Sequence, residues 1–94
     1  MNNIIIELKV KNHPGVLSQV SGLFARRAFN LDGILCSGIG DKTESLILLL
    51  VKNDDRVDQI VKQLEKLYDV SEVTVKAEYN QKVFSSLYKN LTEQ

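Results

Sequence analysis

Apolar and polar residues alternate along the first part of the chain. One side of this alternation is apolar throughout and comprises Ile4, Ile6, Leu8 and Val10. The intervening positions are Ile5, Glu7, Lys9 and Lys11. A period of two is typical of a β-strand, so the pattern predicts a first strand with one mainly polar face.

The next segment changes to helical spacing. Its apolar residues recur three and four positions apart, at Val16, Val20, Leu23 and Phe24. Pro14 suits a first helical position, because its φ is fixed and its missing N–H costs no intrahelical hydrogen bond. Arg26 and Arg27 stand where cations complement the helix dipole. We therefore predict a first helix that begins at Pro14 and closes at these arginines.

A hairpin follows. Residues 31–39 predict a second strand, residues 40–43 a turn, and residues 45–52 a third strand. The third strand is apolar on both faces from Leu46 to Val51, although helices on one side of a sheet cover a single face. The other face must be covered by self-association, by docking on a larger protein, or by the C-terminal tail.

A second helix and a fourth strand complete the pattern. The helix has apolar residues at Val57, Ile60, Val61, Leu64 and Leu67, and residues 53–55 precede it with side chains suited to N-capping. The strand alternates over residues 73–78. The order βαββαβ predicts an α+β, ferredoxin-like fold, with a four-stranded antiparallel sheet in the order 4-1-3-2 and two helices on one face.

The last residues carry a third helical stripe. Its members are Val83, Phe84, Leu87, Tyr88 and Leu91. The pattern divides the chain into a domain at residues 1–78 and a C-terminal helical tail at residues 79–94. Whether the tail packs on its own domain or on a partner subunit stays open at this stage.

Size and charge exclude several function classes. The 94 residues suffice for one domain, and a dimer is plausible at this size. Twelve basic residues balance twelve acidic ones, which argues against nucleic-acid and membrane partners. The first and third strands have no aromatic residues on which RNA bases could stack. A single cysteine and the lack of an export or spanning segment predict a cytoplasmic chain.

Catalytic and metal-binding patterns are nearly absent. His13 and Cys36 could form a base–nucleophile pair, but Cys36 stands inside an apolar strand, where a small core residue is the simpler interpretation. A second histidine is lacking, so no metal site is predicted. Gly33, Gly38 and Gly40 lack the lysine and hydroxyl of a phosphate loop, and they indicate a bulge and a turn instead.

The segment from Asn12 to Leu17 carries the one candidate binding site. Gly15 has no side chain to obstruct a ligand, and the N–H groups of a first helical turn have no intrahelical acceptor. These amides lie beside the positive end of the helix dipole, where a carboxylate fits. The simpler alternative is that Pro14 and Gly15 only start a surface helix.

Three segments of the sequence resemble a known family. The segments Asn12–Leu17, Gly22–Asn30 and Gly33–Cys36 are similar to the small regulatory subunit of acetohydroxyacid synthase, also called acetolactate synthase. The similarity is greatest to the short form found with the bacterial type I isozyme. This is an ACT-domain family, and its βαββαβ fold agrees with the element order predicted from periodicity.

The resemblance implies a non-catalytic subunit that activates a catalytic subunit and confers feedback inhibition by valine in branched-chain amino acid biosynthesis. Thiamine diphosphate, magnesium and FAD are expected on the catalytic subunit, and no cofactor is expected on this chain. In this family the effector lies between two ACT domains, which implies a homodimer. The matching effector-binding positions are Asn12, Gly15, Val16, Leu17 and Asn30, with Ile34 as an apolar neighbour.

Two questions stay open from the sequence. Asn30 could instead serve only as the left-handed residue that ends the first helix. The chain could also be a free-standing ACT domain that senses an amino acid for another enzyme or regulator. Valine, leucine and isoleucine differ too little in an apolar pocket for the sequence to rank them.

Overall fold

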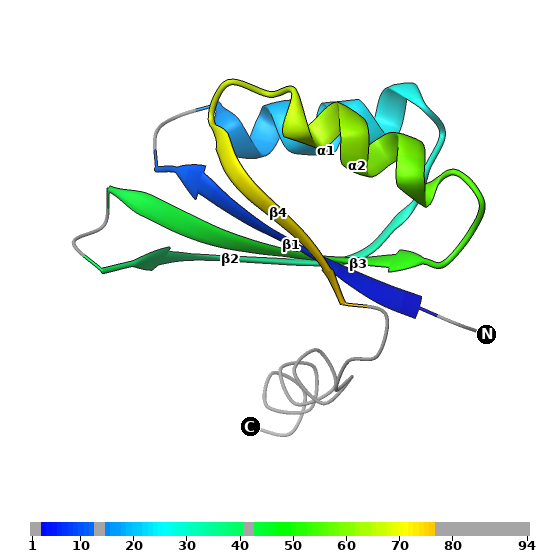
Figure 1. Cartoon of the computed structure of the whole chain (residues 1–94), viewed down its shortest axis with the longest axis horizontal. Helices are drawn as coiled ribbons and strands as arrows, with labels where there is room; N and C mark the ends of the chain where they lie inside the picture. The colour runs from blue at the N-terminus through cyan, green and yellow to red at the C-terminus, as the bar shows by residue number, and fades with distance from the viewer. Residues whose placement is uncertain (1–2, 13–14, 41–42, 77–94) are drawn as a thin grey trace, which may run out of the picture.

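The elements follow the predicted order. The computed structural model describes residues 3–12, 15–40 and 43–76. Within them lie β1 (Asn3–Lys11), α1 (Val16–Arg26), β2 (Leu31–Ile39), β3 (Glu44–Lys52), α2 (Val57–Glu65) and β4 (Val70–Lys76). The βαββαβ order and the α+β, ferredoxin-like class are confirmed (Figure 1).

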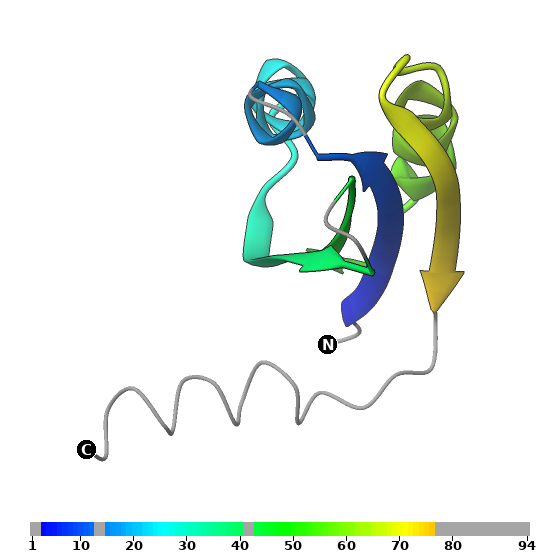
Figure 2. The same ribbon diagram turned by 90° about the vertical axis from the view of Figure 1, so that its left-hand side faces the viewer.

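The four strands form one antiparallel sheet in the order β2-β3-β1-β4, as predicted. In the register, Leu8 of β1 lies opposite Ile47 of β3 and Val73 of β4. Figure 2 shows α1 and α2 side by side on the same face of the sheet, with α1 towards β2 and α2 towards β4. Strand β2 is therefore an edge strand whose outer side has no neighbour within the described chain.

The core lies between the helices and the two central strands. It contains alternate residues of β1 and β3, of which Ile6, Leu8 and Leu49 are fully buried. The helices contribute their apolar stripes, with Phe24 of α1 and Leu64 of α2 almost inaccessible to solvent. The apolar side of the alternating strands thus faces the apolar stripes of the helices, and together they form one buried layer.

The opposite face of the sheet carries no helix within the described residues (Figure 2). On β3 this face holds Leu46, Leu48 and Leu50, which are half-buried. On β1 and β4 it holds ion pairs between Lys9 and Glu72 and between Lys76 and Glu7, each with a nitrogen–oxygen distance of 3.3 Å. The prediction that β3 is apolar on both faces is confirmed.

The boundaries of two elements differ from prediction. Helix α1 begins at Val16 rather than at Pro14, because Gly15 has a φ of 92° that no right-handed helix contains. Strand β4 begins at Val70 rather than at Val73. A bulge leaves Ser71 as an extra residue opposite the Lys9–Val10 step, and this insertion interrupts the alternation in the sequence.

Cys36 is exposed, so its assignment to the core was wrong. It lies opposite Ile47, on the helix side of β2. The apolar residues around it in the sequence suggested burial, but its strand is at the edge of the sheet. His13, Pro14, and the tail at residues 79–94 with its predicted helix fall outside the described residues, and the division at residue 78 stays a prediction.

The glycine predictions are supported at two positions. The register between β2 and β3 shifts between Leu31 and Gly33, which marks a bulge. Gly40 has a φ of 59° at the start of the hairpin turn. Among the described helices, neither α1 nor α2 has the length and apolar character needed to cross a membrane.

Candidate functional site

The candidate site is the elbow between β1 and α1. Asn12 follows β1 directly, and its backbone N–H donates a 2.9 Å hydrogen bond to the carbonyl of Thr43. Gly15 then adopts a left-handed conformation, with φ 92° and ψ −15°, at the N-cap of α1. A Cβ atom at this glycine would have no atom within 4 Å, so the position faces open space.

The N-terminus of α1 is not capped by a side chain. No side-chain hydrogen bond caps the helix at Gly15, and the first turn contains no acidic residue. The Gly15 carbonyl accepts the hydrogen bond of the Gln19 N–H at 2.9 Å, which starts the intrahelical series. The N–H groups before Gln19 have no acceptor inside the helix, and they lie at its positive end. This arrangement favours a small anion.

Val16 and Leu17 have different environments. The Val16 side chain is 5% exposed and belongs to the core, so only its backbone can face a ligand at the elbow. The Leu17 side chain is 43% exposed. Its carbonyl accepts a 3.0 Å hydrogen bond from the Ser21 hydroxyl. Leu17 therefore offers an apolar contact to a ligand or to another subunit.

The C-terminus of α1 is closed by Ala28 rather than by Asn30. Ala28 has a φ of 52°, and its N–H donates to the carbonyl of Ala25 at 3.1 Å. The Phe29 N–H donates to the carbonyl of Phe24 at 3.0 Å. These two bonds define a Schellman motif, which here includes an edge-to-face contact of the two phenylalanine rings at 5.7 Å. The interpretation of Asn30 as the left-handed helix terminator is therefore wrong.

The side chain of Asn30 is held by Asp32. Its Nδ2 donates a 2.8 Å hydrogen bond to Asp32 Oδ1 on the exposed surface. The pairing leaves the Asn30 amide oxygen as a possible acceptor for a ligand N–H. Asp32 lies in the bulge of β2 and was not predicted as a site residue. The signal available in the sequence was that Asp32 follows Asn30 by only two residues, close enough for the two side chains to bond.

Ile34 lies on the same edge of the fold. It is opposite Leu49 in the register, on the helix side of the sheet, and it is 39% exposed. Because β2 is the edge strand beneath α1, an exposed apolar residue here belongs to the outer rim of the core (Figure 2). Leu17 on α1 and Ile34 on β2 are thus both exposed large apolar residues.

One chain brings together part of the predicted site. Asn12, Gly15, Val16 and Leu17 gather at the start of α1, whereas Asn30 follows its other end. The helix has 11 residues, which separates its two ends by about 16 Å at 1.5 Å per residue. A single amino acid is too small to contact both ends of α1 in one chain.

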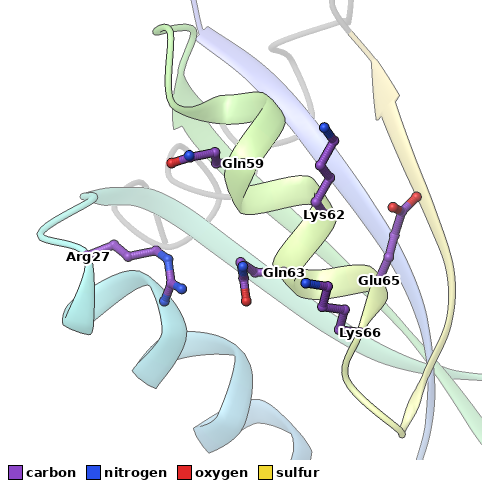
Figure 3. A pocket seen from close by; sticks show the side chains of 6 residues that line it. All are labelled: Arg27, Gln59, Lys62, Gln63, Glu65 and Lys66. Atoms are coloured by element: carbon purple, nitrogen blue, oxygen red, sulfur yellow. The ribbon is translucent and has the colours of Figure 1, made fainter.

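A separate hollow of about 530 Å³ lies between α2 and the end of α1 (Figure 3). Its lining residues are Arg27, Gln59, Lys62, Gln63, Glu65 and Lys66. Figure 3 shows the Arg27 side chain directed from the end of α1 towards α2. Three cations and one carboxylate give the hollow a basic character. It contains none of the residues predicted for the elbow site.

Arg56 connects the two helices next to this hollow. Its Nη1 donates to the carbonyl of Arg27 at 3.2 Å, and its guanidinium lies 4.8 Å from the centre of the Phe29 ring. Asp54 accepts hydrogen bonds from the backbone N–H and the guanidinium of Arg56. These bonds, the backbone one first, lower the pKa of Asp54 below its ordinary value of 3.8. The prediction that side chains of residues 53–55 cap α2 is wrong: Arg56 is the N-cap residue, no side-chain hydrogen bond caps the helix, and Asp54 bonds to Arg56 in the turn before it.

Sequence comparisons identify similar proteins. The family model described as "AHAS small subunit-like ACT domain" matches residues 6–72. The acetolactate synthase isozyme 1 small subunit of Escherichia coli K12 is 56% identical over 72 residues, covering 77% of this chain and 75% of that protein. The probable acetolactate synthase small subunit of Archaeoglobus fulgidus is 41% identical over 73 residues, covering 73% of this chain and 46% of that protein.

Solved structures agree with the sequence comparisons. The crystal structure of the acetolactate synthase small subunit from Thermotoga maritima superposes with a TM-score of 0.71 at 37% identity, over 80% of this chain and 47% of that chain. The regulatory subunit of aspartate kinase from Thermus flavus gives a TM-score of 0.67 at 18% identity, over 83% of this chain and 53% of that chain. The second likeness concerns the fold alone.

Proposed function

Because the chain belongs to the family of acetolactate synthase small subunits with an ACT domain, we propose that it activates a thiamine-diphosphate-dependent catalytic subunit and inhibits it when valine binds. The activity that it regulates would belong to branched-chain amino acid biosynthesis. The proposal assigns the chemistry to the partner and the effector site to this chain.

The observation that carries the proposal is the uncapped start of α1. Within the described residues, no side chain caps this helix start and the first turn has no carboxylate, and Gly15 leaves the approach open. A free amino acid offers the missing partner, since its carboxylate can accept hydrogen bonds from first-turn amides. The positive end of the helix dipole adds to that attraction.

A second copy of the chain would complete the site. A two-fold axis perpendicular to α1 sets two copies of the helix antiparallel, so that the elbow of one copy lies beside Asn30 of the other. In one chain these residues lie too far apart to bind one amino acid together, so the effector site would need both copies. The exposed Leu17 and Ile34 on the same edge supply apolar area for such a contact.

In this arrangement each part of the effector has a partner of matching chemistry. The carboxylate meets the amides from Gly15 to Leu17, and the ammonium donates to the Asn30 amide oxygen. The negative charge of Asp32, 2.8 Å from the Asn30 nitrogen, further favours an ammonium group at that end. The aliphatic side chain packs against Ile34, where most of the contact is apolar.

Regulation requires that valine bind one arrangement of the complex more tightly than the other. An effector with equal affinity for the active and inhibited arrangements would change neither population. The pair of ACT domains is the proposed two-state element, because its interface contains the effector and would open or close around it.

The test uses the enzyme reconstituted from this chain and its catalytic subunit. Gly15→Asp places a carboxylate where the effector carboxylate belongs, whereas Gly15→Asn adds nearly the same bulk without charge and tolerates the left-handed backbone. We expect Gly15→Asp to abolish valine inhibition while activation persists, and Gly15→Asn to weaken inhibition less. Normal valine inhibition in Gly15→Asp would contradict the proposed site.

The partner is tested separately. The tagged chain should co-purify with a thiamine-diphosphate enzyme from its own source, and it should raise the activity of that enzyme. Capture of a different enzyme or of a transcriptional regulator would favour the alternative of a free-standing amino acid sensor.

A further inference from the structure

The sheet face without helices carries a defined apolar patch. We call it the open-face patch, and it comprises Ile5, Leu35, Leu46, Leu48 and Leu50. Antiparallel pairing places these residues together, since Leu50 lies opposite Ile5, and Leu48 lies opposite Leu35. The β1–β4 half of the same face is polar and neutralised by its ion pairs. The patch is therefore a stripe along β3 with a definite polar border.

Ile5 differs from the other buried apolar residues of the described chain. It is 4% exposed, yet it does not belong to the core cluster beneath the helices. Helices α1 and α2 lie on the other face and cannot cover it (Figure 2). The described helices therefore do not explain the burial of Ile5.

The end of β4 indicates a candidate segment for covering Ile5. Lys76, the last residue of β4, lies directly opposite Ile5 in the register. Residues 77–94 continue from that point, and they contain the stripe of Val83, Phe84, Leu87, Tyr88 and Leu91. The chain thus leaves the sheet next to the most buried member of the patch, with an apolar helical stripe still to place.

From these observations we propose that the C-terminal tail of the same chain folds back as an amphipathic helix and covers the open-face patch. The proposal concerns contacts inside one chain and does not depend on the proposed function. It resolves the two alternatives for the tail in favour of its own domain.

The dimensions of the two surfaces agree. From β4 to β2 the sheet is about 14 Å wide, at about 4.8 Å per strand step. Residues 77–82 can span about 20 Å when extended, which suffices for the tail to reach β3 or β2. The helical stripe from Val83 to Leu91 is about 12 Å long, and the patch from Leu46 to Leu50 is about 13 Å long.

The test measures where the tail lies in the full-length chain. A nitroxide is attached at Lys89→Cys, opposite the apolar stripe, in a Cys36→Ser background, and amide signals are recorded by NMR. We expect strong broadening of the amides of Leu48 and Leu50 and little broadening along α2. Leu87→Asp should remove the effect, whereas Ser86→Asp, on the polar side of the same helix, should preserve it.

A mixed sample identifies the source of the tail. Isotope-labelled chains without nitroxide are combined with unlabelled chains that carry it. Sharp signals for Leu48 and Leu50 in this mixture, together with broadening in the singly labelled chain, support the proposal. Broadening in the mixture assigns the patch to the tail of a second copy and overturns it. Absence of broadening in both samples also overturns it and leaves the patch to another partner.

Discussion

Asn30 and Asp32 are joined side chain to side chain by a 2.8 Å hydrogen bond just past the end of α1. The bond orients an amide that the family resemblance assigns to effector binding. It also places a carboxylate beside that amide. Asp32 is therefore expected to act on the effector through the position of Asn30 and through its own charge.

Asp32→Ala should weaken valine binding by about 2- to 10-fold, since a hydrogen bond contributes about 0.5–1.5 kcal/mol. Asp32→Asn retains an acceptor for Asn30 and separates the effect of charge from that of orientation. Isothermal titration of the purified chain with valine measures both variants. Asp55→Ala, in the loop before α2, serves as the control with unchanged affinity. Equal affinity in Asp32→Ala and the parent chain would exclude this role.

The reactivity of the Cys36 thiol tests whether two copies of the chain meet along α1 and β2. Because it is exposed on β2, it should react with a thiol reagent in the native protein without denaturant. If two copies meet along α1 and β2, the reaction should slow as protein concentration rises, and slow further with valine. Stopped-flow measurement at several concentrations tests this. A rate independent of both concentration and valine would place the interface elsewhere.

Ala28 is a position where the backbone conformation opposes the residue type. An L-residue in the left-handed region costs roughly 1–2 kcal/mol, and glycine avoids this cost at a helix C-terminus. We expect Ala28→Gly to raise the free energy of unfolding by about 0.5–1 kcal/mol, after the larger entropy of unfolded glycine is included. Urea denaturation measures the change.

The matched control is Ala25→Gly, three residues earlier and inside α1. The same substitution there should lower the free energy of unfolding by about 1 kcal/mol, since glycine is a poor helix former. Opposite signs for the two variants are the expected result. A destabilising Ala28→Gly would mean that the Schellman motif contributes no strain.

Asp54 gives the fold a dependence on acid pH. Its pKa is lowered in the folded state by the hydrogen bonds from Arg56, so its contribution to stability is present above the ordinary value of 3.8. The contribution is lost as the pH falls through the lowered pKa. Asp54→Asn should therefore be less stable than the parent chain at pH 6, and this difference should shrink towards pH 2. Urea midpoints across this range test it, and a constant difference would contradict it.

The fold was predictable from the sequence because its signals are local. Alternation in β1 and helical spacing in α2 each follow from contacts with a single apolar layer, and the topology follows from their order. The bulge at Ser71 was not predictable, since one inserted residue on β4 removes the period-two signal. Cys36 was misplaced for a different reason: the predicted strand order already put its strand at an edge, but its apolar neighbours in the sequence suggested burial.

The members of the candidate site stay a prediction, to which the structure adds Asp32 as the partner of Asn30. Gly15 stands out in sequence because it follows Pro14. The role of Ala28 as the residue that ends α1 could not be predicted, because the left-handed residue at a helix C-terminus is usually glycine. This left Asn30 as the apparent terminator. The predicted helix already separated Gly15 from Asn30, whereas the bond between Asn30 and Asp32 at the bulge of β2 could not be predicted.

The ring of Phe29 has a mechanical consequence. Its edge-to-face contact ties it to Phe24 in α1, and the Arg56 guanidinium clamps it from the α2 side. The first residue of β2 follows only two positions later. A displacement of the C-terminal end of α1 is therefore expected to move the start of α2 and the start of the edge strand with it, because Phe29 and Arg56 join the three at one point.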